Sequence, residues 1–220
     1  MLAAVITGDI INSTARTGFV EKLRRVLTDV GIRFRLKEEN WEIYRGDSFQ
    51  VVTGEPEHAL MVAMLIRAGL RSGTYYPDLQ DRFDAKTAIG IGTISRLRDK
   101  PGESAGEAFL YSGRKLDELQ EKKYHMAIRT GFRVLDPLAD SILRFADDII
   151  SNWSEVSADT ACYHWFGNYN QEQLAEKLGI SQPAVNKRLH AARIPLLEHA
   201  DRNFELTLQT ITHDRTSPAI

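Results

Sequence analysis

Hydrophobic and polar positions in the first third of the chain follow the spacings of strands and helices. Residues 2–7 form a short apolar run that ends at Gly8 and Asp9, which predicts a buried strand. Apolar side chains then recur at helical spacing through residues 19–30, which predicts an amphipathic helix. Residues 41–51 alternate about the turn formers Gly46 and Asp47, so we expect a β-hairpin there.

The next segments continue to mix the two patterns. Residues 59–70 are apolar around most of a helical circumference, and residues 85–94 predict a central strand whose Gly90 and Gly92 allow another element to approach closely. We expect a third helix at about residues 108–122 and short strands at about residues 125–130 and 132–135. The order β-α-β-β-α-β-α-β favours a ferredoxin-like α+β domain with its helices against one face of the sheet.

The pattern changes at Asp136 and Pro137. From residue 138 onward we find no convincing strand pattern, and three or four helical patterns follow, interrupted near residues 165–170 and at Gly179. We therefore expect two domains: an α+β domain at residues 1–137 and an all-α domain at residues 138–220.

Composition narrows the class of protein. With 43% hydrophobic and 26% charged residues among 220, the chain is typical of a soluble globular protein. The single cysteine, Cys162, excludes an internal disulfide, and we find neither a signal peptide nor an apolar run long enough for a membrane helix. We expect a cytoplasmic protein with no membrane partner. The net charge of -2 argues against broad, charge-driven binding to nucleic acid.

A local basic segment nevertheless lies near the C-terminal end, at residues 170–193. Leu174, Ala175 and Leu178 form one apolar helix face, Gly179 breaks that helix, and Ser181 is a good N-cap for the next. This spacing resembles the DNA-binding helix-turn-helix of sigma-factor-like and related bacterial regulators. A helical hairpin that serves dimerisation or packing is the alternative interpretation.

The resemblance implies that the second helix enters the major groove of DNA. Its base contacts and phosphate contacts would come from Ser181, Gln182, Pro183, Asn186, Lys187, Arg188 and Arg193. Residues 181–193 carry three basic side chains and no acidic one, a local charge of +3. Because one such unit offers few contacts, we expect a homodimer that binds two half-sites.

Two aspartates end or turn strands in the first domain, Asp9 after the first apolar run and Asp47 in the hairpin. Carboxylates brought together by neighbouring strands suit Mg²⁺ or Mn²⁺, which can neutralise the phosphates of a nucleotide. The simpler alternative is that Asp9 caps a strand end and Asp47 forms a turn.

The segments GDIINST, RGDSFQVV, AIGIGTI and GEAFLYSGRKLDEL resemble, in this order, parts of the class III nucleotidyl cyclase catalytic domain. With the C-terminal motif included, the chain resembles more closely still the SatD family, small bacterial proteins that join such a domain to a helix-turn-helix. The resemblance implies a site at a head-to-tail dimer interface. The resemblance implies that Asp9 and Asp47 bind the metal with their carboxylates and that Ile10 reaches it with its backbone carbonyl. Ser13 and Thr14, at the start of the first helix, would bind phosphate. Arg114 would stabilise the transition state.

Other positions depart from the cyclase pattern. Ile43 replaces the lysine that selects adenine, Leu110 replaces the asparagine that orients ribose, and Glu103 lies at or near the base-selecting acidic position. Loss of orienting groups can cost orders of magnitude in rate. Our leading hypothesis is therefore a DNA-binding transcriptional regulator whose degenerate cyclase-like domain senses a nucleotide or related phosphorylated ligand, or serves dimerisation. The alternatives are an active nucleotidyl cyclase or related nucleotide-modifying enzyme that uses Mg or Mn, and a protein-interaction scaffold.

Overall fold

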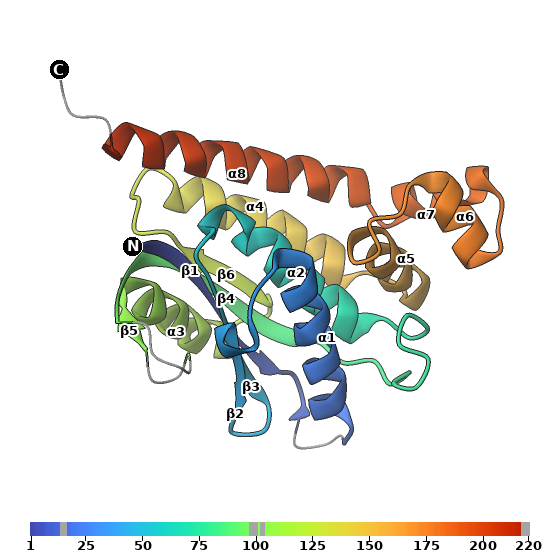
Figure 1. Ribbon diagram of the computed structural model, residues 1–220, viewed down its shortest axis with the longest axis horizontal. Coiled ribbons are helices and arrows are strands. Elements are labelled where there is room, and N and C mark those ends of the chain that lie inside the picture. The colour runs from blue at the N-terminus through green and yellow to red at the C-terminus, as the bar shows by residue number, and fades with distance from the viewer. Residues whose placement is uncertain (14–16, 97–100, 102–103, 217–220) are drawn as a thin grey trace.

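A mixed sheet organises the first half of the protein in the computed structural model, which describes residues 1–13, 17–96, 101 and 104–216. Its strands in the described residues are β1 (Leu2–Ile10), β2 (Trp41–Tyr44), β3 (Ser48–Thr53), β4 (Ala85–Arg96), β5 (Ala105–Gly106) and β6 (Met126–Arg129). Their order is β2-β3-β1-β4-β5, with β6 paired parallel to β4 and the other pairs antiparallel. The expected mixture of helix and strand, the hairpin and the central strand are confirmed (Figure 1).

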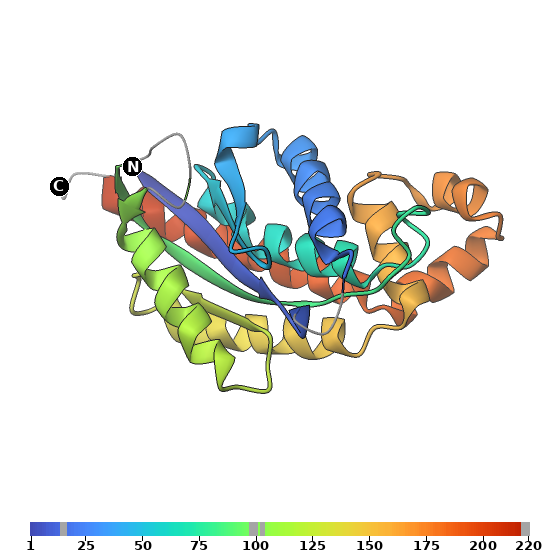
Figure 2. The same ribbon diagram turned by 90° about the horizontal axis from the view of Figure 1, so that it is seen from below.

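Helices cover both faces of this sheet, so the expectation that they cover one face is wrong. Ala4 and Ile6 of β1 join the large hydrophobic core with α1 (Phe19–Phe34) and α2 (Ala59–Arg71). Val5 of the same strand packs with Ala108 of α3 (Glu107–Gln120), which lies on the opposite side of β1 and β4 from α1 (Figure 2). The continuous apolar run in residues 2–7, rather than an alternating one, is typical of a strand buried on both faces.

The close approach expected at the glycines of β4 is confirmed. A Cβ atom on Gly90 would collide with the carbonyl oxygen of Ala108 and the backbone nitrogen of Ser112, both in α3. Because Gly90 has no side chain, α3 can lie directly on the centre of the sheet. Nearby, the hydroxyl of Thr7 donates to that of Ser112 at 2.9 Å, which fixes the same helix to β1.

The second half contains helices α4 (Asp136–Ser151), α5 (Glu155–Trp165), α6 (Gln171–Leu178), α7 (Gln182–Ala191) and α8 (Ile194–Thr216). These five helices of the described residues exceed the three or four expected. The strand expected at residues 132–135 is wrong: those residues form a turn, because Asp136 accepts hydrogen bonds from the Thr130 amide at 2.6 Å and hydroxyl at 2.7 Å. In the described part of the chain, no helix is both long and apolar enough to cross a membrane.

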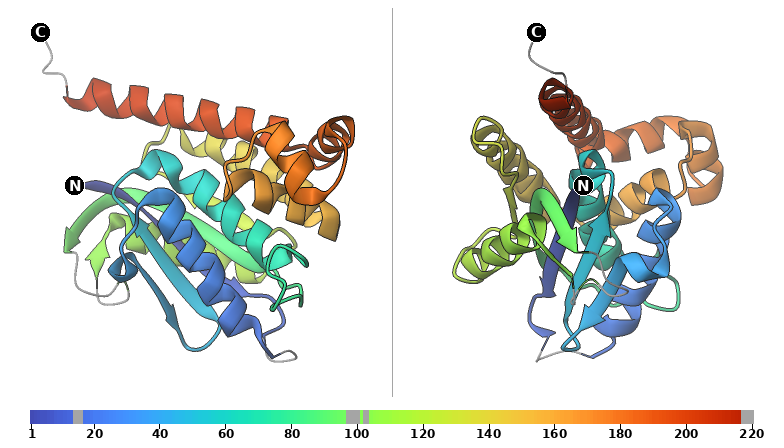
Figure 3. Two further views of the ribbon diagram at one scale, coloured as in Figure 1. Left: turned by 45° about the vertical axis from the view of Figure 1, so that its right-hand side comes forward. Right: turned by 60° about the vertical axis from the view of Figure 1, so that its left-hand side comes forward.

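One hydrophobic core crosses the boundary expected at residue 137. It includes Leu27 of α1, Leu65 of α2, Leu143 of α4 and Leu197 of α8. Figure 3 shows α4 and α8 lying along the α2 side of the sheet, with α6 and α7 at one end of the molecule. The position of α6 and α7 is therefore set by helices that pack on the α/β part.

A fully buried arginine on α2 joins the two halves. Arg67 donates to Asp147 of α4 at 2.6 Å and, through two nitrogens, to Asp84 at 2.8 and 2.7 Å. Arg71, one turn later, also donates to Asp84 at 2.7 Å. Burial, the largest single effect, raises the pKa of Asp84, but the charges of Arg67 and Arg71 and the hydrogen bonds to this carboxylate together outweigh it, so the pKa is lowered. The network thus connects α2 with α4 and with the residue that precedes β4.

We predict that Arg67→Met destabilises the protein by roughly 3–5 kcal/mol, because it leaves Asp147 and Asp84 buried with one cation fewer. The free energy of unfolding in urea measures this. Lys115→Met, which removes a surface ion pair with Glu118, is the matched control and should cost less than about 1 kcal/mol. Equal effects of the two substitutions would contradict the role of Arg67.

The raised pKa of Asp201 on α8 should make the stability of the protein depend on pH. Burial and the nearby charges of Glu205 and Glu198 raise its pKa to about 7, although the backbone of Met61 forms a hydrogen bond with it. Since the pKa of Asp201 in the folded protein exceeds the ordinary aspartate pKa of 3.8, ionisation costs stability as pH rises from about 4 to 7.

We therefore predict that Asp201→Asn raises stability by roughly 1–3 kcal/mol at pH 8 and has little effect at pH 4. Thermal unfolding at the two pH values checks this. Asp117→Asn, at an exposed position of α3, is the control that should show no such difference. A pH-independent effect of Asp201→Asn would count against the titration.

Candidate functional site

The two candidate aspartates meet at one corner of the sheet. Asp9, near the end of β1, lies opposite Ser48 of β3 and Lys86 of β4 in the strand register. Asp47 immediately precedes β3, and its carbonyl accepts a hydrogen bond from the Ile10 amide at 3.0 Å. The turn before it uses left-handed conformations at Arg45 (φ 53°) and Gly46 (φ 86°), as tight hairpins require. The hairpin therefore brings Asp47 beside the end of β1.

Electrostatics make this corner receptive to a cation. Burial raises the pKa of Asp9, a hydrogen bond from the Ser48 hydroxyl at 2.9 Å lowers it, and the negative charge of Asp47 raises it again. Two half-buried carboxylates that repel each other are relieved by a divalent ion. Carboxylate oxygens are ligands that Mg²⁺ and Mn²⁺ prefer, but the described part of the chain contains no group of three or more His, Cys, Asp or Glu side chains that could hold a metal ion.

Ser13 is placed differently from the sequence expectation. Ser13 lies in a 3-10 turn, whereas the α-helix α1 begins only at Phe19, after Gly18 in a left-handed conformation with φ 86°. The Ser13 hydroxyl instead donates to Asp47 Oδ2 at 2.6 Å, so this residue supports the carboxylate corner directly. Thr14, the other phosphate candidate, lies outside the described residues.

Arg114 is exposed on α3. Within the described residues it makes no hydrogen bond or ion pair with Asp9 or Asp47. Gln120, at the end of α3, lies close enough to Asp9 to lower the pKa of its carboxylate. Six residues at 1.5 Å each place Arg114 about 9 Å farther along the helix. Arg114 therefore lies nearly two helical turns from the end of α3 that approaches Asp9.

Of the residues that depart from the cyclase pattern, Ile43 is half-buried and Leu110 is exposed. Ile43 lies in β2, half-buried and opposite Phe49, whereas Leu110 is 47% exposed on α3. Glu103 is outside the described residues. Neither Ile43 nor Leu110 carries a polar group that could orient a nucleoside.

The sequence interpretation missed three residues at the corner: Ser48, Lys86 and Gln120. Lys86 donates from Nζ to the α3 carbonyls of Leu119 at 2.6 Å and Gln120 at 2.9 Å, which ties the end of α3 to β4. Ser48 could have been inferred from the hairpin register, because it directly follows Asp47. Lys86 and Gln120 come from strands and helices far along the chain and leave no local pattern.

A second candidate site is the pair α6 and α7. Asn170 caps α6 and Gly179 ends it in the left-handed conformation with φ 63°. Ser181 caps α7 by accepting a hydrogen bond from the Ala184 amide at 3.4 Å. The predicted break at Gly179 and the N-cap at Ser181 are confirmed. Leu174, Val185 and Leu189 are buried, so the two helices pack through the apolar positions that the sequence indicated.

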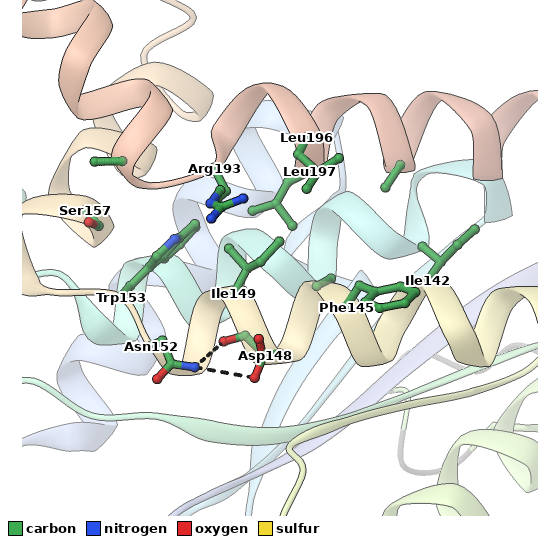
Figure 4. A pocket seen from close by; sticks show the side chains of 13 residues that line it. Ile142, Phe145, Asp148, Ile149, Asn152, Trp153, Ser157, Arg193, Leu196 and Leu197 are labelled. Carbon is green, nitrogen blue, oxygen red and sulfur yellow. Dashed lines mark hydrogen bonds between the residues drawn. The ribbon is translucent and has the colours of Figure 1, made fainter.

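The remaining side of α7 faces solvent. The exposed residues there are Ser181, Gln182, Pro183, Asn186 and Lys187, while Arg188 is half-buried. Arg193 follows α7 in a left-handed conformation with φ 57°. Its side chain lies near Ile149 and Leu197, in a groove between α4 and α8 (Figure 4). The structure thus gathers most of the predicted DNA-contacting residues on one helix and sets Arg193 apart.

Comparison with known proteins gives little further information. No protein-family model matches the chain, and no curated protein matches it. A solved structure described as "Structure of a bacterial light-regulated adenylyl cyclase" aligns with a TM-score of 0.38 and 12% sequence identity. The alignment covers 60% of this chain and 44% of that chain, so this protein spans less than half of the matched cyclase chain.

Proposed function

We propose that the protein is a DNA-binding transcriptional regulator in which α6 and α7 form a helix-turn-helix and α7 is the recognition helix. The observation that carries the proposal is the exposed side of α7, where Gln182, Asn186 and Lys187 project from a helix fixed by its cap and by two buried apolar residues. A recognition helix needs both properties, because it must present polar side chains without shifting.

The polar and basic side chains of α7 suit two kinds of DNA contact, to bases and to phosphates. Gln182 and Asn186 can pair through two hydrogen bonds with adenine in the major groove. Lys187 and Arg188 are suited to backbone phosphates, whose contacts position the protein. Since residues 181–193 carry no acidic side chain, the surface is locally basic although the whole chain is slightly acidic.

We further propose that the α/β part is a degenerate cyclase-like domain of the SatD type, which binds Mg²⁺ or Mn²⁺ with a nucleotide or related phosphorylated ligand. The support is the shared corner of Asp9 and Asp47 and its mutual repulsion. Ile43 and Leu110 lack the groups that would orient a nucleoside for reaction, which favours binding over turnover. An active cyclase is the competing proposal, and an interaction scaffold is the third.

We predict that Lys187→Ala weakens DNA binding for all sequences and lowers the salt dependence of log K by about 1, because one phosphate contact is lost. Asn186→Ala should instead relax preference at one base pair, by roughly 1–3 kcal/mol. Selection from a genomic DNA library identifies a sequence, and fluorescence anisotropy then measures both variants. Lys37→Ala, whose side chain is 77% exposed on another surface, is the control. If no sequence is enriched, the DNA-binding proposal fails.

We predict that Asp9→Asn and Asp47→Asn each weaken Mn²⁺ binding at least roughly tenfold, because each removes one of two charged ligands. Electron paramagnetic resonance of free Mn²⁺ measures this, with Asp117→Asn as a carboxylate control away from the corner. Unchanged affinity in both variants would contradict the metal site. Cyclic or modified product from labelled nucleoside triphosphates that disappears in Asp47→Asn would favour the enzyme instead.

A further inference from the structure

Exposed apolar side chains gather on the face formed by α4 and α8. Phe145 of α4 is 72% exposed, Leu138 of α4 is 50% exposed, and Leu196 of α8 is 50% exposed. Leu138 and Phe145 are seven residues apart, so they lie on the same side of their helix. A contiguous apolar face of this kind marks an interaction surface, whereas single exposed apolar residues do not.

A groove with a volume of about 600 Å³ runs between the two helices. Figure 4 shows Phe145, Ile149 and Leu197 pointing into it from both sides. The helices are antiparallel: the indole nitrogen of Trp153, just after α4, donates to the carbonyl of Ala192, just before α8, at 2.8 Å. Two antiparallel helices with an apolar groove between them form half of a four-helix bundle.

Charges on the two sides of the groove have opposite signs. The α4 side carries Asp148, beside Asn152, and the α8 side carries Arg193. His199 lies farther along α8, in the adjoining hollow that Arg193 also lines. In the described residues, Arg193 has no hydrogen-bond or ion-pair partner for its side chain. A surface that is acidic on one side and basic on the other is complementary to a copy of itself turned by 180°.

We propose that a second copy of this chain docks on the α4–α8 face, with α4 of each copy packed against α8 of the other in a four-helix bundle. This arrangement buries Phe145, Leu138 and Leu196 and brings Arg193 of one copy toward Asp148 of its partner. The corner with Asp9 and Asp47 stays outside the interface, because the β2–β3 turn lies on the far side of the molecule from α8 (Figure 1).

The proposed dimer also fixes the two copies of α7. The Trp153–Ala192 hydrogen bond attaches the end of α7 to the α4–α8 face, so pairing of this face sets the spacing between the two recognition helices. The inference extends the proposed DNA binding but does not depend on it. Its test measures mass without DNA, so the two proposals can fail separately.

Sedimentation equilibrium of the full chain, over a series of concentrations, tests the docking surface. We expect a mass of twice the 24.9 kDa of one chain. Phe145→Glu should weaken the dimer at least roughly tenfold, because a charge would enter the apolar interface. Ile32→Glu is the matched control, since Ile32 is 73% exposed but lies on α1, and it should leave the dimer intact. Circular dichroism of both variants reports whether they remain folded.

A charge reversal supplies a second test that leaves the apolar core untouched. Asp148→Arg and Arg193→Asp should each weaken the dimer, and the double variant should recover most of the affinity of the original chain. Aspartate tolerates the left-handed backbone at position 193. A monomeric wild-type chain at all concentrations, a dimer unaffected by Phe145→Glu, or a double variant no tighter than the single ones would each overturn the proposal. The first outcome would leave the groove for another occupant, and the second would place the dimer on another face.

Discussion

The buried guanidinium of Arg67 is the interaction on which the arrangement of the two halves depends. It lies on α2, between the sheet and the C-terminal helices, and it is fully buried. Its two carboxylate partners come from different elements, Asp84 from the segment before β4 and Asp147 from α4. A charge in this environment is tolerated only when both partners are held in place, so α2, α4 and β4 must assemble together.

Both candidate sites, the corner of Asp9 and Asp47 and the helix α7, are linked to the ion pairs that Arg67 forms with Asp84 and Asp147. On one side, Asp84 is two residues before Lys86, which lies beside Asp9 and holds the end of α3. On the other side, Asp147 belongs to α4, whose last turn leads to Trp153 and the anchor of α7. The corner of Asp9 and Asp47 and the helix α7 are therefore connected through a continuous set of contacts, although they are far apart.

Local patterns predicted the fold well where the physical cause is local. The hairpin around Gly46, the break at Gly179 and the cap at Ser181 each follow from the backbone preferences of one or two residues. The strand expected at residues 132–135 failed because Asp136 forms a competing turn that apolar spacing does not reveal. The coverage of both sheet faces was indicated by the unbroken apolar run of β1 but was not inferred from it.

The parts of the candidate site that could not be predicted depend on contacts between distant residues. Asp9 and Asp47 can be identified as candidates from the sequence, but they lie at one corner only because β1 pairs with β3 in this register. Similarly, Ser13 was expected at a helix start, and its contact with Asp47 depends on how the chain leaves β1 before α1 begins. Such placements follow from packing of the whole domain, which propensity and spacing do not encode.

The left-handed turn at Arg193 has a mechanical consequence. A residue other than glycine in this conformation costs about 1–2 kcal/mol, and it is kept here because α8 begins immediately afterwards and Trp153 holds the preceding carbonyl. The joint between α7 and α8 is therefore held by a hydrogen bond from outside both helices. Since α8 has 23 residues, it is a rod about 35 Å long with α7 fixed at one end. A rotation of α8 by a few degrees would be transmitted to α7 as a tilt of the helix.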